Sequence, residues 1–110
     1  MQKLVNYHSN LAHGTVFRFP GSYPHEKYVD LILVEFPDND RKFGLVVTTG
    51  HKAGLILVKL PKEAESNHFA GIDRQWVIDN WNKWIYETCN VDDVYVIQNY
   101  PIPVIDYSKP

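Results

Sequence analysis

Four apolar runs separated by turn-forming residues dominate the first half of this chain. They read TVFRF, YVDLILVEF, KFGLVVTT and GLILVKL, and they occupy residues 15–19, 28–36, 42–49 and 54–60. The runs are rich in β-branched and aromatic residues, and Pro20-Gly21, Pro37-Asp38 and Pro61 end three of them. Short strands joined by polar turns favour an antiparallel meander. Because the runs are apolar almost throughout, we expect the sheet to be covered on both faces or to close into a barrel-like form.

The segment VVTTGHKAGLILVKLP, residues 46–61, places two glycines and a lysine between two of these runs. A phosphate-binding P-loop needs Gly-x-x-x-x-Gly-Lys-Ser/Thr and must lead into a helix, whose N-terminus supplies aligned N–H groups. Here only three residues separate Gly50 from Gly54, and an apolar strand pattern follows. We therefore interpret the segment as a hairpin connection in which glycine supplies a positive φ.

One long amphipathic helix is predicted near the C-terminus, in RQWVIDNWNKWIYETC, residues 74–89. Asp73 suits the N-cap position, and Asn90 suits a left-handed position after the helix. A periodicity of about 100° per residue gathers Val77, Trp81, Trp84, Ile85 and Thr88 on one stripe, which we expect to pack on the sheet. Tyr86 falls on the opposite, polar side.

The remaining segment, DDVYVIQNY at 92–100, alternates cleanly and predicts a fifth strand, after which Pro101 and Pro103 favour an extended surface tail. A length of 110 residues fits a single domain over residues 1–110. The predicted fold class is α+β, a curved antiparallel sheet of about five strands packed by one long amphipathic helix.

Charge is unevenly divided along the chain. Residues 1–62 carry eight Lys and Arg against five acids, and residues 63–110 carry three against eight, so the two parts have net charges of +3 and −5. Such asymmetry can mark an acidic docking face, or it can be chance clustering on a solvated surface.

Few residues suggest chemistry. The five histidines have neither HxH nor HxxxH spacing, and the lone Cys89 lies at the helix end that does not favour a thiolate, so we expect no metal, no cofactor and no catalytic residue. A single cysteine fits a reducing compartment, and no secretory signal or membrane-spanning run is visible. We expect a soluble cytoplasmic protein.

Four segments together resemble small immunity proteins of bacterial polymorphic-toxin and contact-dependent growth-inhibition systems. They are FRFPGSYPHEKYVD, VVTTGHKAGLILVKLP, WVIDNWNKWIYE and VDDVYV, and the resemblance spans roughly residues 15–100. It implies a cytoplasmic, non-enzymatic protein that binds one cognate toxin domain and blocks its active site. Many such toxins are nucleases with basic grooves, which an acidic inhibitor face would complement without itself binding nucleic acid.

Our candidate partner contacts follow from that implication. They lie on the polar side of the helix, in the 62–71 loop and in the 90–93 turn: Glu63, Glu65, Asp79, Tyr86, Glu87, Asp92 and Asp93. A second hypothesis is a small hydrolase or ribonuclease that uses His13, His51 and Lys52, since two imidazoles and a cation can act on a phosphate. A third is a regulatory binding module without a toxin partner.

Overall fold

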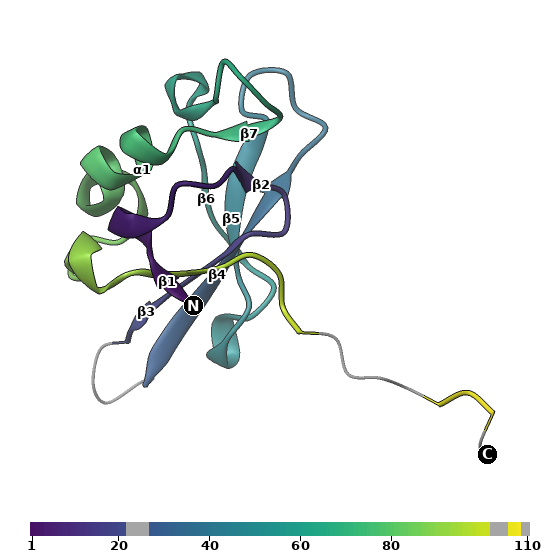
Figure 1. Cartoon of the computed structure of the whole chain (residues 1–110). Helices are drawn as coiled ribbons and strands as arrows, with labels where there is room; N and C mark the ends of the chain where they lie inside the picture. The colour runs from purple at the N-terminus through teal and green to yellow at the C-terminus, as the bar shows by residue number, and fades with distance from the viewer. Residues whose placement is uncertain (22–26, 102–105, 109–110) are drawn as a thin grey trace.

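The main feature of the computed structural model, which describes residues 1–21, 27–101 and 106–108, is an open six-stranded antiparallel sheet (Figure 1). Its strand order is β1-β8-β3-β4-β5-β6, so β1 and β6 are the edges and the sheet does not close into a barrel. The strands are β1 (Gln2–Lys3), β3 (Val16–Pro20), β4 (Tyr28–Glu35), β5 (Phe43–Val47), β6 (Ile56–Lys59) and β8 (Tyr95–Ile97).

The five strands predicted from the apolar runs are all present. The strands β3 to β6 form the expected meander, in which each strand pairs antiparallel with the next. The last predicted strand is β8, which pairs with β3 and is shorter than expected. Three two-residue strands were not predicted: β1, and the pair β2 (Leu11–Ala12) and β7 (Gly71–Ile72), which form a separate small sheet. Most of the predicted tail, residues 102–105 and 109–110, lies outside the described residues.

The hairpin interpretation of the glycine loop is confirmed. The connection between β5 and β6 is a 3-10 turn, η2 (Gly50–Lys52), and both flanking glycines have positive φ, 69° for Gly50 and 93° for Gly54. The Val47 N–H donates to the Leu55 carbonyl at 2.9 Å, and the Gly54 N–H donates to the Val47 carbonyl at 2.7 Å. These bonds close the hairpin, and a strand rather than a helix follows it.

The predicted long helix is much shorter than expected. An α-helix, α1 (Arg74–Asn80), continues directly into a π-helical segment, η4 (Trp81–Ile85), and together they have seven plus five residues. The Asp73 N-cap is confirmed, because its carboxylate accepts the Trp76 N–H at 2.9 Å. The remaining helical segments are the 3-10 turns η1 (Leu4–Asn6), η3 (Lys62–Ala64) and η5 (Val91–Asp93).

The chain leaves the helix at Tyr86, which is extended with φ −148° and ψ 112°. The Asn82 side-chain amide then holds the segment that follows, donating to the carbonyls of Tyr86, Glu87 and Cys89 at 3.2, 3.0 and 2.6 Å. The left-handed conformation predicted for Asn90 is wrong: its φ is −68°, and its side chain accepts the Asp92 N–H. The reason is that the helix ends earlier, so Asn90 caps η5 instead.

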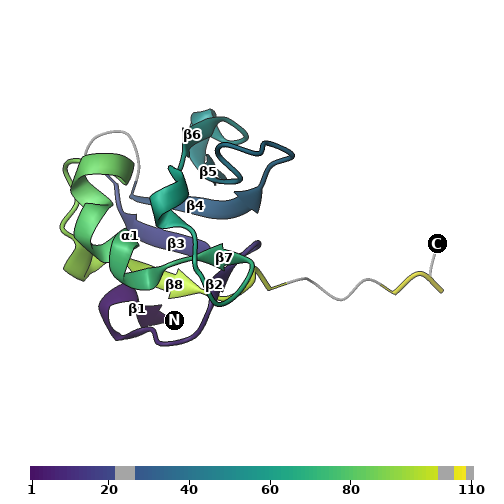
Figure 2. The same ribbon diagram turned by 90° about the horizontal axis from the view of Figure 1, so that it is seen from above.

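One face of the large sheet carries the hydrophobic core. Phe17 and Phe19 of β3 point toward Trp81 of η4, with ring centroids 5.9 and 5.4 Å apart, so the odd-numbered side chains of β3 face the helix. Figures 1 and 2 show α1 packed against this face of the sheet. The predicted stripe is largely confirmed: Val77, Trp81 and Ile85 are buried, Trp84 is half-buried and Thr88 is exposed.

The opposite face, which we call the open face, bears Arg18, Asp30 and Ile32. Val16 on this face is buried, yet it does not belong to the apolar cluster that Trp81 and its neighbours form. Tyr28 and Tyr95 are 43% and 36% exposed. The expectation that both faces are covered is therefore wrong, because polar and half-exposed residues alternate with the buried ones along the same strands.

Candidate functional site

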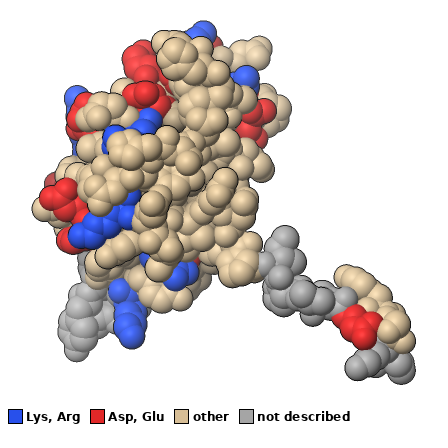
Figure 3. Space-filling model, in the orientation of Figure 1, with Lys and Arg blue, Asp and Glu red and all other residues tan. Residues whose placement is uncertain are grey.

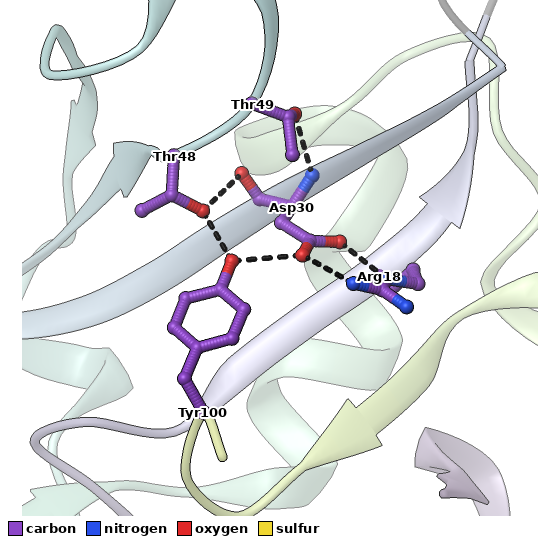
Figure 4. Close-up of polar contacts among 5 residues, drawn as sticks. All are labelled: Arg18, Asp30, Thr48, Thr49 and Tyr100. Carbon is purple, nitrogen blue, oxygen red and sulfur yellow. Dashed lines mark hydrogen bonds and ion pairs between the residues drawn. The ribbon is translucent and has the colours of Figure 1, made fainter. Parts of the chain in front are cut away.

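A buried carboxylate organises the polar part of the open face (Figure 4). Asp30 of β4 is 1% exposed, and Arg18, its cross-strand partner on β3, donates to it twice, from Nε at 2.7 Å and from Nη2 at 2.8 Å. The Tyr100 hydroxyl donates to the same carboxylate at 2.8 Å. Paired, charge-assisted hydrogen bonds of this kind offset much of the free energy needed to bury a charge.

Two threonines that follow β5 complete this cluster. The Thr49 hydroxyl accepts the Asp30 N–H at 3.0 Å, and the Thr48 hydroxyl contacts the Tyr100 hydroxyl (Figure 4). Because Tyr100 has one hydroxyl proton and gives it to Asp30, the Thr48 hydroxyl is the donor to Tyr100. Three side-chain hydrogen bonds therefore converge on the Asp30 carboxylate, and the threonines bond its backbone N–H and the Tyr100 hydroxyl.

The surroundings of Arg18 and Tyr100 favour the protonated form of each side chain. The hydrogen bond to Asp30 raises the pKa of Arg18, and burial is the main cause that raises the pKa of Tyr100 to about 12. Both groups therefore keep their protons at neutral pH. Arg18 also lies 4.4 Å from the centroid of the Tyr28 ring, in a cation–π contact. The cluster orients Arg18 and Tyr100 on the open face, and both stay protonated.

Sequence reasoning missed Arg18, Asp30 and Tyr100. The available signal was one charged residue in the middle of FRF and another in YVDLIL, because a charge inside an apolar strand needs a partner. Their pairing depends on strand register, which the sequence alone did not specify.

Beside the polar cluster, an apolar row crosses five strands. The register aligns Ile97 with Val16, Val16 with Ile32, Ile32 with Val46, and Val46 with Ile56. Cross-strand partners project on the same face, so these side chains form a continuous strip on the open face. Ile97, Ile32 and Val46 are half-buried, and exposure increases toward the edge at β6, where Ile56 is 52% exposed.

The residues predicted to contact a partner lie elsewhere, on α1, η4 and the adjoining turns η3 and η5, which we call the helical layer. Glu63 lies on η3, and the half-buried Glu65 follows directly after it. Both are close to the start of α1, because the Asp73 N–H donates to the Ala64 carbonyl. Asp79 is exposed on α1 and accepts a hydrogen bond from Gln75.

The other predicted acids lie beyond the helix, all exposed: Glu87 after η4, and Asp92 and Asp93 on η5. The seven residues are thus distributed along the helical layer and are not gathered at one point. On the side shown in Figure 3, acidic and basic side chains are interspersed around the margin of the body, and uncharged side chains occupy its centre.

The predicted orientation of the Tyr86 side chain is wrong. It was predicted to project from the polar side of the helix, but it packs against the core, with its ring 4.6 Å from that of Phe19. The Tyr86 N–H donates to the Trp81 carbonyl, five residues back, at 2.9 Å. This π-type bond accommodates one residue more than an α-helical turn does and changes the side on which Tyr86 emerges.

The three residues of the hydrolase hypothesis are not brought together. The His13 Nδ1 accepts the Glu35 N–H at 3.0 Å, at the end of β4, whereas His51 and Lys52 lie in the turn that follows β5. That turn begins beside Asp30, whose carbonyl accepts the Thr48 N–H. Glu35 is five residue steps along the strand from Asp30, or about 16 Å at 3.3 Å per step.

Other reactive groups are also poorly placed for chemistry. Cys89 is buried, and burial, with the nearby Asp93, raises the pKa of its thiol. Within residues 1–21, 27–101 and 106–108, no group of three or more His, Cys, Asp or Glu could hold a metal ion. In the same ranges, no helix has the length and apolar character required to cross a bilayer.

Comparison with known proteins identifies the family. A family model described as Immunity protein 45 matches residues 4–96, from η1 to the middle of β8. The chain belongs to this family. The resemblance to immunity proteins of polymorphic-toxin systems is thereby confirmed. No curated protein and no solved structure matches the chain.

Proposed function

We propose that this chain binds a cognate bacterial toxin domain and neutralises it by covering the toxin's active site. The match to the Immunity protein 45 family over residues 4–96 carries the proposal, because an immunity protein implies a toxin partner. The open face supports it further: protein interfaces are enriched in Tyr and Arg, and Tyr28, Tyr95 and Arg18 lie there beside an apolar row.

The toxin is proposed to be a delivered effector of a polymorphic or contact-dependent growth-inhibition system, acting in the cytoplasm, and a nuclease is our first candidate. The net charge of −5 over residues 63–110, most of it on the helical layer, would oppose the charge of a basic nucleic-acid groove and speed the encounter. We keep the predicted contacts on the helical layer as the acidic surface that meets the toxin. One of them, Tyr86, is half-buried beside Phe19.

Inhibition of this kind needs no catalytic group in the chain itself. A protein that occludes an active site acts by affinity, and its slow dissociation keeps the toxin silent. The separation of His13 from the turn that bears His51 and Lys52 weighs against the hydrolase hypothesis. Activity of the isolated chain that His51→Ala abolishes would revive it.

Co-expression tests the proposal. The toxin domain encoded immediately upstream is induced in cells with and without this chain, and growth is recorded. We expect growth to be arrested without the chain and restored with it, and the two proteins to co-purify. Equal killing in both cultures would overturn the proposal and favour a regulatory module without a toxin partner.

A further inference from the structure

An unusual exposed apolar run begins one residue before the edge strand β6 and continues into it. Leu55, Ile56 and Leu57 are consecutive, and they are 60%, 52% and 40% exposed. The other large apolar side chains that are exposed in the described part of the chain are Tyr28 and Tyr95 on the same sheet, and Met1 and Tyr107 near the chain ends. The helical layer contributes none of them. A cluster of exposed apolar side chains on a soluble domain marks a surface that binds another molecule.

The backbone of β6 is also available on one side. Among the described residues, the strand pairs with β5 alone. The Leu60 N–H donates inward to the Phe43 carbonyl, and because antiparallel ladders alternate, the backbone groups of Lys59 point outward. The Lys59 carbonyl accepts Arg41 Nη1 at 3.1 Å, which fits that direction. Natural edge strands are protected by short length, bulges, lysine, inward-pointing charges, proline or a covering segment. β6 has the first three, because it is four residues long with a register shift and ends at Lys59, yet Ile56 and Leu57 remain 52% and 40% exposed.

The apolar character continues from this edge onto the open face. Ile56 is aligned with Val46, which begins the row that leads across the sheet to Ile97. A register shift between Leu45 and Val46 allows Leu57 to be accommodated as an extra residue on β6. A strand added beside β6 would therefore find a sheet edge without a neighbouring strand and apolar contacts on its flank, and it would have to displace Arg41 from the Lys59 carbonyl.

Charge indicates which strand fits. Lys52 lies before the apolar run, and Lys59 and Arg41 lie at its other end, whereas residues 41–62 contain no acid. Lys59 is partly neutralised by Asp38 at 3.3 Å, but Lys52 and Arg41 form no ion pair within the described residues. Antiparallel pairing of two copies through β6 would bring Lys52 of one copy toward the Lys59 end of the other. Like charges at both ends disfavour a second copy and favour a strand with acidic ends.

We propose that an extended segment of the toxin domain, apolar in its centre and acidic at its ends, adds to the sheet as a strand next to β6. This inference rests on the proposed function and names the surface that performs it. The acids of the helical layer then act on the rate of encounter, and the β6 edge determines how long the complex lasts.

The test measures association and dissociation rates with the toxin domain encoded immediately upstream, purified away from this chain by denaturation and refolding. Ile56→Lys and Leu57→Lys place charges on exposed edge positions, Ile56→Val is the matched conservative control, and Asp79→Lys with Glu87→Lys changes the helical layer. Circular dichroism confirms that each variant is folded. Hydrogen exchange of the β6 amides, with and without toxin, reports strand addition directly.

We expect Ile56→Lys and Leu57→Lys to weaken binding by about 30-fold or more, mainly through faster dissociation. Ile56→Val should stay within about threefold, and the helical-layer variant should mainly slow association. Amides of β6 should gain protection on binding.

Two results would overturn the inference while leaving the proposed function intact. One is unchanged binding by both lysine variants together with a large loss in the helical-layer variant. The other is a dimer, detected by light scattering, that Ile56→Lys converts to a monomer without changing toxin affinity. Failure of the unaltered chain to bind the toxin would overturn both proposals together.

Discussion

The two faces of the large sheet are built from the same strands and differ in almost every physical respect. On one face, Phe17, Phe19 and Trp81 belong to a single apolar cluster with edge-on and tilted ring contacts. On the other, an ion-pair cluster at buried Asp30 lies beside an aliphatic row that is buried at Val16 and partly exposed at Ile32 and Val46. The difference teaches that alternate residues of one strand can have separate roles: one set forms the apolar core, and the other forms a polar cluster and a partly exposed apolar row.

The largest effect should come from the helix-covered face. Trp81→Ala removes a fully buried ring that contacts Phe17 and Phe19, and we expect a loss of about 3–5 kcal/mol in the free energy of unfolding, measured by urea denaturation. Val46→Ala, on the half-exposed row of the open face, should lose only about 1 kcal/mol. Similar losses in the two variants would erase the distinction between the faces.

The buried carboxylate should have the next largest effect. Asp30→Asn leaves Arg18 without its ion pair, and we expect a loss of about 2 kcal/mol in the free energy of unfolding. Arg18 is 31% exposed, so water compensates for part of the missing interaction. Asp38→Asn alters the exposed pair with Lys59 and serves as the control, for which little change is expected. A larger loss from the control would contradict the importance of burial.

A smaller effect should appear at alkaline pH. The pKa of Tyr100 is raised to about 12 in the folded chain from an ordinary value of 10.0, so the folded state binds this proton more tightly than the unfolded state does. The contribution is complete below pH 10 and is lost as the pH rises through 12.

Tyr100→Phe lacks this contribution. The difference in unfolding free energy between the parent chain and Tyr100→Phe should therefore shrink as the pH rises above 10. Comparing the two chains removes the titration of the other tyrosines and of the lysines. A difference that is constant with pH would mean that neither burial nor Asp30 raises the pKa of Tyr100 in the folded chain.

The smallest effect on stability should come from the β6 edge. Ile56 is 52% exposed, and we expect Ile56→Lys to change the free energy of unfolding by no more than about 0.5 kcal/mol. Leu45→Lys, on the neighbouring strand and fully buried, should prevent folding. If Ile56→Lys were strongly destabilising, the edge would be part of the core and its exposure would say nothing about a partner.

Local chemistry in the sequence predicted much of the fold. Pro20, Pro37 and Pro61 ended the runs that became strands, glycines at 50 and 54 produced the hairpin, and Asp73 capped the helix. These features depend on a few adjacent residues, so a pattern of letters is enough to predict them. The curvature of the sheet and the limits of the domain stay predictions.

What could not be predicted depends on contacts between distant segments. The Arg18–Asp30–Tyr100 cluster joins three parts of the chain through strand register, and neither propensity nor spacing specifies it. The exposure of Leu55, Ile56 and Leu57 was missed because an apolar run was assumed to be buried. The contacts predicted on the helical layer, apart from Tyr86, follow from charge, which indicates where steering occurs and not where a partner is held.

The π-helical segment has a consequence for family members. Its Trp81–Tyr86 hydrogen bond spans one residue more than an α-helix requires, so a relative that lost a single residue here could close an ordinary turn without disturbing the strands on either side. In such a relative the aromatic ring at this position would swing away from Phe19, and an aliphatic side chain would have to fill the space. Length variation at one place in the helix would then remodel the packing next to β3 while the sheet stayed the same.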